Sequence, residues 1–223
     1  MKKQSIILLL TLTICVAAFG QKHFCTDFNE QQLGAEWQYL QQPDASKYVL
    51  HDGMLRLYGS PYNLKDHEPT TFLALPQTTP QFTAETSISF FDDESGDEAG
   101  MCVYLSDSCY VQLFINNNKG EHRLKLQFQL RSHQWLIAEK HLSRTFEKMW
   151  LRIACDSQYY QFFYSLDGQK FQLLDQIERL LLSPAIAGSN SLPLVGMFVF
   201  TGTTKYQTGY SYADFDFFDY RAQ

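Results

Sequence analysis

The sequence predicts an all-β protein, built as an antiparallel sandwich or barrel. Short segments with alternating apolar and polar residues recur along the chain, whereas a helical period is scarce. These segments are rich in Val, Ile, Phe and Tyr, and aromatic residues make up 15% of the chain. Turn signals containing Gly, Asn and Asp separate the segments at regular spacing, which is typical of about a dozen short strands in one sheet sandwich.

The first half of this pattern contains a clear hairpin and a clear buried face. His51-Asp52-Gly53 is a turn signal between residues 48–50 and 54–59, which indicates a hairpin. Residues 82–90 alternate, so that one face of this strand carries Phe82, Ala84, Thr86 and Ile88.

The middle of the chain continues as a series of hairpins. Residues 101–105 and 109–115 flank a tight turn, and the turn "NNNKGE" leads into a strand with an apolar side. That apolar side holds Leu124, Leu126, Phe128 and Leu130. Further strands are expected at 134–142, 150–156, 159–165, 170–174, 194–202 and 213–220.

One connection has some helical character. "DQIERLLLSPAI" (residues 175–186) predicts a short turn of helix that ends before Pro184, because proline does not fit a helix interior. The chain shows neither a linker nor an internal repeat, so residues 21–223 are expected to form a single β-sandwich domain.

The first twenty residues have the pattern of a secretory signal peptide. Lys2 and Lys3 precede an apolar run that is short for a membrane span, and Ala18-Phe19-Gly20 predicts cleavage before Gln21. We therefore expect residues 1–20 to be removed and the protein to be secreted or periplasmic, without a membrane span.

Charge narrows the range of partners. The formal net charge is −6, and removal of Lys2 and Lys3 would make it −8. A protein that binds nucleic acid needs clustered Lys and Arg, so this acidic balance argues against such a partner. It is compatible with a neutral polysaccharide or oligosaccharide.

Four cysteines follow the predicted cleavage point: Cys25, Cys102, Cys109 and Cys155. Export permits disulfides, and four thiols allow three pairings. In the hairpin of residues 101–115, however, Cys102 and Cys109 would not lie opposite each other. The other interpretation is that the cysteines are unpaired and act as small buried apolar residues.

The end of the chain, "ADFDFFDY", places acids and aromatics in near alternation. A period of two residues would turn Phe215 and Phe217 into the core and Asp214 and Asp216 outward. The strand near Phe24 has a similar pattern, and pairing of the first and last strands would bring Asp27 near these acids. Two hypotheses follow: a calcium site formed by Asp27, Asp214 and Asp216 with backbone carbonyls, or a solvated acidic face on an edge strand.

Catalytic signals are weak in this sequence. The densest acidic stretch, "FFDDESGDEAG", is expected to form a solvated loop, where mutually repelling carboxylates are poor candidates for a tuned acid–base pair. The sequence also shows no G-x-S-x-G elbow and no H-E-x-x-H pair. We therefore expect no catalytic residues, although a glycoside hydrolase that uses a cleft on the sandwich stays an alternative.

Aromatic residues in polar surroundings are candidates for sugar stacking, since sugars present apolar faces to Trp and Tyr rings. The candidates for carbohydrate binding are Trp37, Trp135, Tyr206 and Tyr210.

The order of motifs resembles one known family. It runs "DFNEQQLGAEWQYLQQP", "YVLHDGMLRLYG", "EPTTFLALPQ", "DEAGMCVYL", "WLRIACDSQYYQFFYSLDGQKFQLL" and "ADFDFFDY". Over residues 24–220 the chain resembles the C-terminal concanavalin A-like β-sandwich of family 43 glycoside hydrolases, of the β-xylosidase and arabinofuranosidase type.

The resemblance implies a jelly-roll sandwich of two antiparallel sheets. In that family the catalytic carboxylates lie in a separate five-bladed propeller upstream, whereas here the predicted signal peptide leads straight into the sandwich. The resemblance thus implies an accessory module acting on xylan- or arabinan-type polysaccharide, with a separate glycosidase as a possible partner. It also implies that the loop "SNSLPLVGMFVF" borders the partner's sugar pocket, with Leu194 where the family has Phe.

Overall fold

The computed structural model describes residues 23–40, 45–90, 96–118, 121–143, 146–188, 191–202 and 211–223. The signal-peptide interpretation of residues 1–20 therefore lies outside the described residues. Within the described part of the chain, no helix is long and apolar enough to span a membrane.

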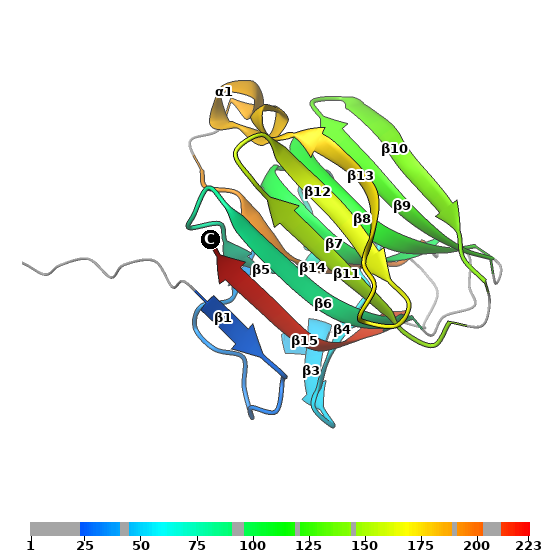
Figure 1. Cartoon of the computed structure of the whole chain (residues 1–223). Coiled ribbons are helices and arrows are strands. Elements are labelled where there is room, and N and C mark those ends of the chain that lie inside the picture. Colours follow the sequence, from blue (N-terminus) through cyan, green and yellow to red (C-terminus); the bar gives the residue numbers. More distant parts are fainter. Residues whose placement is uncertain are drawn as a thin grey trace, which may run out of the picture.

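Two antiparallel sheets pack face to face in a concanavalin A-like sandwich, which confirms the expected fold class (Figure 1). Sheet A has eight strands: β13 (Gln172–Glu178), β12 (Tyr159–Ser165), β11 (Met149–Cys155), β6 (Phe82–Phe90), β15 (Tyr212–Ala222), β4 (Met54–Tyr58) and β3 (Tyr48–His51), in this order, with β1 (His23–Thr26) on β15. Sheet B has seven strands, in the order β10 (His133–His141), β9 (Glu121–Leu130), β8 (Cys109–Asn118), β7 (Asp97–Ser106), β14 (Leu194–Phe200), β5 (Thr71–Pro76) and β2 (Gln38–Tyr39).

Three short helical turns connect these strands: η1 (Ala45–Lys47), η2 (Arg179–Leu182) and α1 (Pro184–Ala187). The last two follow each other at one end of the sandwich. The sequence predicted one helical turn that ends before Pro184. The η2 turn does end there, at Leu182, and Pro184 begins a second turn, α1. Proline fits there because the first helical position needs no N–H donor and suits its fixed φ.

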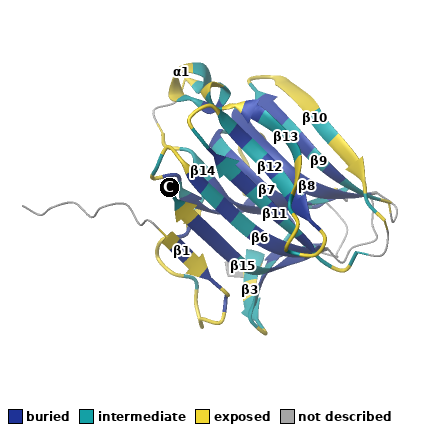
Figure 2. Ribbon diagram, in the orientation of Figure 1, coloured by how far each residue is buried: buried dark blue, intermediate teal, exposed yellow. Residues whose placement is uncertain are grey.

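The core lies between the sheets, where the inward residues of both sheets form one apolar cluster. Dark blue residues run along the sandwich interior in Figure 2, whereas the outer strand β10 is mostly exposed. The predicted face of β6 is confirmed, since Phe82, Ala84, Thr86 and Ile88 are all fully buried. The predicted 48–58 hairpin is confirmed as well, and its turn residues Asp52 and Gly53 have φ values of 50° and 69°.

A second, smaller apolar cluster covers the outer face of sheet B. It brings Leu64, from the segment between β4 and β5, against strand residues that point away from the main core. These strand residues are Phe72, Ala74, Cys102, Tyr110, Phe114 and Phe198.

The two ends of the described chain pair as expected, because β1 lies antiparallel to β15 with Phe24 opposite Tyr220. The prediction that Phe217 of β15 points into the core is wrong. A bulge between Phe215 and Phe218 shifts the alternation, so Phe215 and Phe218 are fully buried while Phe217 is partly exposed.

All four described cysteines are unpaired, and Cys102, Cys109 and Cys155 are buried. The interpretation of all four cysteines as buried apolar residues is wrong for Cys25, which is exposed on the outer side of β1.

Candidate functional site

Three neighbouring cavities lie at the end of the sandwich that carries η2 and α1. The largest has a volume of about 680 Å³, and the others about 460 and 260 Å³. Ser191 and Leu192 line both the largest and the smallest cavity, and Arg179 and Ser183 line both the smallest and the remaining one. The cavities therefore form one continuous surface, which we call the end surface.

The segment after β13 shapes the end surface. The η2 turn closes with a hydrogen bond from the Ser183 N–H to the Leu180 carbonyl (3.1 Å), and α1 closes with one from the Gly188 N–H to Pro184 (2.9 Å). Gly188 ends α1 with φ 68°, a conformation that glycine adopts without strain. These two compact turns project Arg179 and Leu180 toward the cavities.

The largest cavity contains Leu194, the residue that the family resemblance singles out. In β14, Leu194 pairs with Tyr104 of β7 on one side and Pro76 of β5 on the other. Its surroundings combine aromatic, apolar and polar groups: Gln38, Tyr39, Leu40, Pro76, Tyr104, Leu105, Ser106, Asp107, Ser191 and Leu192.

Two tyrosines of this cavity pack their rings against other tyrosines and keep neutral hydroxyls. Tyr104 stacks on Tyr110 at 6.1 Å between ring centroids, and Tyr39 lies 6.1 Å from Tyr48. Burial raises the pKa of Tyr39 and Tyr104, so each phenol keeps its proton over the physiological range. An apolar ring with a hydroxyl is the combination that suits a sugar ring.

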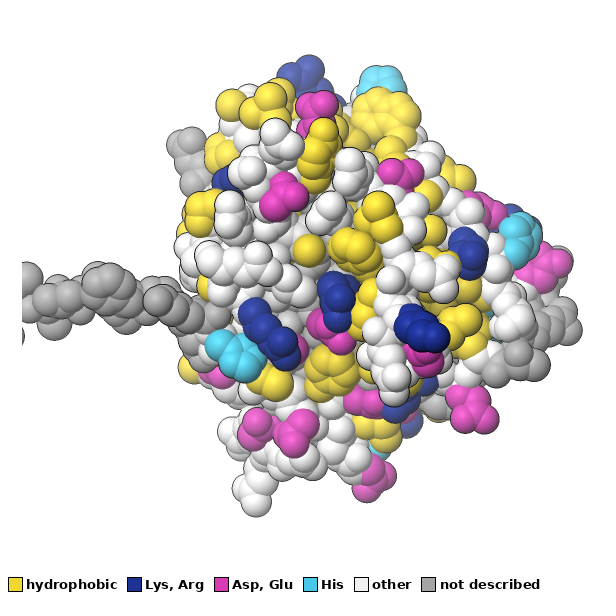
Figure 3. Space-filling model, in the orientation of Figure 1, with side chains coloured by type: hydrophobic (Ala, Val, Ile, Leu, Met, Phe, Trp, Pro, Cys, Tyr) yellow, Lys and Arg dark blue, Asp and Glu magenta, His cyan; other side chains and the backbone are white. Residues whose placement is uncertain are grey.

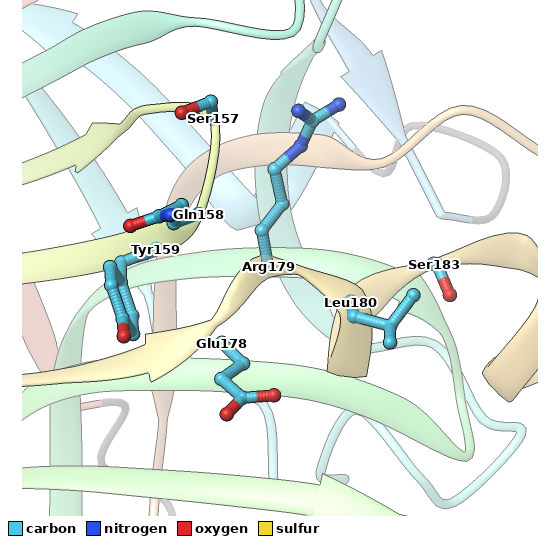
Figure 4. Close-up of a pocket in the computed structure, with 7 residues that line it drawn as sticks. All are labelled: Ser157, Gln158, Tyr159, Glu178, Arg179, Leu180 and Ser183. Atoms are coloured by element: carbon cyan, nitrogen blue, oxygen red, sulfur yellow. The ribbon is translucent and has the colours of Figure 1, made fainter.

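Figure 4 shows the cavity of about 460 Å³. Ser157, Gln158 and Tyr159 lie on one side, Leu180 and Ser183 lie on the other, and Arg179 stands between them. The Arg179 N–H donates to the Gln158 carbonyl (2.8 Å), which joins η2 to the turn before β12. The guanidinium, amide and hydroxyl groups can donate hydrogen bonds to a polar ligand.

Apolar residues border the end surface as well. Leu180 and Leu192 are 64% and 63% exposed, the largest values among the exposed large hydrophobic residues described. Figure 3 shows hydrophobic side chains gathered with charged ones over this end, at the top of the view. Such a mixture is found at surfaces that contact another molecule.

The two described aromatic candidates for sugar binding, Trp37 and Trp135, do not lie together. Trp37 lies in the core, 7% exposed, with its ring 5.4 Å from Phe24 and 5.2 Å from Phe218. Trp135 is 44% exposed on β10, where it stacks on Phe128 and His133, away from the three cavities. Tyr206 and Tyr210 lie outside the described residues.

The three aspartates named for calcium are also separate. Asp27 is exposed and accepts a hydrogen bond from the Asn29 N–H (3.3 Å). Asp216 accepts from Ser87 (2.8 Å) and pairs with Lys148. Asp214 does not face water as expected: it is 3% exposed and accepts two hydrogen bonds of 2.7 Å from Arg56, which also lies over the Tyr212 ring.

The acidic stretch before Gly100 was expected to be a solvated loop, and this is wrong for its last two acids. Asp97 and Glu98 begin β7, and Asp97 is fully buried and accepts from the Gly202 N–H (2.9 Å). Burial raises the pKa of Glu98 to about 7, with Lys125 opposing the shift and Asp97 adding to it.

Sequence reasoning therefore missed Glu98 and, apart from Leu194, the residues of the end surface. A signal for Glu98 was present in its cross-strand neighbours: Asn116 on β8 donates to Glu98 (3.5 Å), and Lys125 on β9 donates to Asn116 (3.2 Å). For Tyr104 the signal was its phase in β7, which turns it away from the core like Cys102. Arg179 had no signal in the strand pattern.

Comparison with known proteins gives a match over most of the chain. The family model described as "Beta xylosidase C-terminal Concanavalin A-like domain" matches residues 25–221. A non-reducing end alpha-L-arabinofuranosidase, BoGH43B of Bacteroides ovatus, is 25% identical over 197 residues, which are 87% of this chain and 36% of that protein. A xylan 1,3-beta-xylosidase of a Vibrio species is 27% identical over 196 residues, 81% of this chain and 34% of that protein.

A solved structure agrees with these matches. The crystal structure of the GH43 protein BlXynB from Bacillus licheniformis superposes with a TM-score of 0.80 at 25% identity, over 89% of this chain and 39% of that one. This chain therefore spans little more than a third of the length of these similar proteins.

Proposed function

Because this chain belongs to the family of β-xylosidase C-terminal concanavalin A-like domains, we propose that it is an accessory module for degradation of plant polysaccharide. In this proposal the end surface binds a chain of the xylan or arabinan class, and a separate glycosidase cleaves it. The pattern of residues 1–20 supports export, so that the module works outside the cytoplasm.

One observation carries the proposal: the largest of the three cavities lies beside Leu194 and has two half-buried tyrosines, Tyr39 and Tyr104, in its wall. A tyrosine ring can stack on the apolar face of a pentose, while Gln38, Ser106 and Asp107 offer hydrogen bonds to its hydroxyls. The names of the similar proteins, an arabinofuranosidase and a xylosidase, support pentose-containing polymers as the ligand class.

The neighbouring cavity supports a chain rather than a single sugar as the ligand. Arg179 borders the cavity of about 460 Å³ and the smallest one, which in turn shares Leu192 with the largest. A linear oligosaccharide lying along this row would meet tyrosine at one end and guanidinium at the other.

Affinity electrophoresis through arabinoxylan and calorimetry with xylo- and arabino-oligosaccharides test the proposal. We expect retarded migration, and we expect Tyr104→Ala and Arg179→Ala each to weaken binding at least about tenfold, a typical loss for a stacking or charged contact. Trp135→Ala is the matched control, because Trp135 is an exposed aromatic residue away from the cavities. Equal loss in Trp135→Ala, or no binding by the native protein, would contradict the assignment.

The role of a separate glycosidase needs its own assay. We expect the protein alone to release no reducing sugar from xylan or arabinan, and to increase the rate at which an added β-xylosidase acts on the insoluble polymer. An unchanged rate would remove the partner from the proposal and leave the glycan-binding part standing.

A second candidate function, hydrolysis by the sandwich itself, needs a carboxyl group that holds its proton near neutral pH. Burial raises the pKa of Glu98 to about 7, although Glu98 lines none of the three cavities. If purified protein releases reducing sugar and Glu98→Gln abolishes that release, this second function replaces the first.

A further inference from the structure

A cluster of three metal-binding side chains lies where the two ends of the described chain meet. His23, Cys25 and Asp219 each offer a ligand atom, and these atoms all lie within 4.8 Å of one another. Among the described residues, this is the one group of three or more His, Cys, Asp or Glu side chains placed so closely.

The strand pairing explains why these residues meet. In β1, Phe24 and Thr26 point into the sandwich, so His23 and Cys25 project from its outer side. The register places Cys25 directly opposite Asp219 of β15 and His23 opposite Arg221, which puts His23 on the diagonal to Asp219. The cluster is therefore built by backbone pairing and not by a chance meeting of loops.

The distances are close to those of a coordinated ion. The Nε2 atom of His23 lies 3.0 Å from Oδ1 of Asp219. Zinc binds histidine nitrogen at about 2.0–2.1 Å, carboxylate oxygen at about 2.0–2.2 Å and thiolate sulfur at about 2.3 Å, so tetrahedral ligand atoms lie about 3.4–3.6 Å apart. His23 and Cys25 are exposed and can reach this spacing by small side-chain rotations.

The ligand set carries negative charge for a cation. The Asp219 carboxylate lies beside the imidazole of His23 and the thiol of Cys25. A metal ion binds cysteine as thiolate, histidine as neutral imidazole and aspartate as carboxylate, so metal binding at this cluster would release the thiol proton.

Arg221 orients the carboxylate. Its Nη2 pairs with Oδ2 of Asp219, and its Nε donates to Oδ1 at 3.1 Å. The side chain of Arg221 is 66% exposed, so it can keep the Oδ2 contact while Oδ1 turns to a metal. In Figure 3, a histidine and basic side chains lie together at the lower left, over the edge where β1 meets β15 in Figure 1.

We propose that His23, Cys25 and Asp219 form a binding site for a divalent transition metal of the zinc class, which joins strand β1 to strand β15. Nitrogen, sulfur and oxygen ligands select such ions over calcium and magnesium, which prefer oxygen alone. Three protein ligands leave a fourth position for water. This site is independent of the end surface and of the calcium hypothesis for Asp27, Asp214 and Asp216.

Calorimetric titration of untagged, thiol-reduced protein with ZnCl₂ tests the site, with CaCl₂ as the comparison ion. We expect one Zn²⁺ per chain and no heat with Ca²⁺. At free Zn²⁺ about 100 times the dissociation constant, we expect the melting temperature to rise by about 5 °C or more. Co²⁺ in place of Zn²⁺ should give a thiolate-to-metal charge-transfer absorption.

Two exposed substitutions distinguish this site from adventitious binding. Cys25→Ser and His23→Gln should each weaken Zn²⁺ binding at least about tenfold, and Cys25→Ser should remove the Co²⁺ charge-transfer band. His141→Gln is the matched control, since His141 is an exposed histidine on β10, and it should bind Zn²⁺ as the native protein does. Failure of the native protein to bind Zn²⁺, or full affinity in Cys25→Ser, would overturn the proposal.

Discussion

The bulge in β15 makes a sharp prediction about two adjacent phenylalanines. Phe218→Ala should destabilise the protein severely, while Phe217→Ala should have a small effect. The two changes remove the same atoms from neighbouring positions of one strand. They differ in burial, because Phe218 is fully buried and Phe217 is partly exposed on the outer face of sheet A.

The structure sets the size of the expected difference. The Phe218 ring packs edge-on against Trp37 with centroids 5.2 Å apart, and Trp37 in turn contacts Phe24 and Phe28. Removing a buried phenylalanine costs about 3–5 kcal/mol, and the lost ring pair places Phe218→Ala in the upper half of that range. Phe217→Ala should cost about 1 kcal/mol, the centre of the distribution for point mutations in general.

Thermal unfolding followed by circular dichroism measures the difference. For a domain of this size, about 1 kcal/mol corresponds to about 2–4 °C, so Phe218→Ala should lower the melting temperature by about 8–20 °C and Phe217→Ala by about 2–4 °C. If both variants lose the same stability, or Phe217→Ala loses more, then β15 alternates regularly from Phe215 to Phe218. The register shift assigned between these two residues would then be wrong.

Three further predictions follow from the buried groups. Asp214→Asn should destabilise the protein by about 2–4 kcal/mol in urea titrations, because it leaves the Arg56 guanidinium without its carboxylate. In the same titrations Asp52→Asn, at an exposed turn, should change the free energy of unfolding by less than about 0.5 kcal/mol. Because the pKa of Glu98 is raised to about 7 from 4.5, the folded state holds this proton more tightly than the unfolded state does, so the free energy of unfolding falls as pH rises from about 4.5 to 7. Relative to the native protein, Glu98→Gln should therefore gain about 3 kcal/mol of stability between pH 4 and pH 8, and a difference that does not change with pH would contradict this. Of the four described cysteines, only Cys25 should react with Ellman's reagent in the folded protein, while Cys102, Cys109 and Cys155 should react after unfolding, as peptide mapping of the labelled protein would show.

Much of the sandwich could be predicted from the sequence because its signals are local. The Asp52-Gly53 turn determines the β3–β4 hairpin, since few residues other than Gly, Asn and Asp adopt positive φ at both turn positions. Strict alternation over nine residues identified the buried face of β6. The family resemblance gave the jelly-roll arrangement, which local patterns left open between sandwich and barrel.

The errors arise where tertiary structure changes the local pattern. The β15 bulge adds one residue to the alternation, and a regular period of two residues contains no sign of it. Asp97 and Glu98 were assigned to a loop because acids are usually solvated, yet both carboxylates accept hydrogen bonds in the fold: Asp97 from the Gly202 N–H just after β14, and Glu98 from Asn116 on β8. Pro184 indicated an end of helix and also begins one: its missing N–H and its ring exclude it from a helix interior, whereas its fixed φ suits the first helical position.

The candidate site was the least predictable part. Leu194 came from the resemblance alone, and its cavity depends on Tyr39, Tyr104 and Leu192, which are far apart in the sequence. Likewise His23 and Cys25 are 196 and 194 residues from Asp219 along the chain, so only the β1–β15 register brings them together.

The two strands nearest the C-terminus both occupy interior positions: β14 lies between β7 and β5, and β15 lies between β6 and β4. Synthesis must therefore pass β14 before sheet B can become continuous, and pass β15 before sheet A can. Until then, β6 and β4 have an unfilled space between them, and the same holds for β7 and β5. Deletion of the last twelve residues should leave a collapsed and aggregation-prone chain, whereas a short extension after Gln223 should be tolerated.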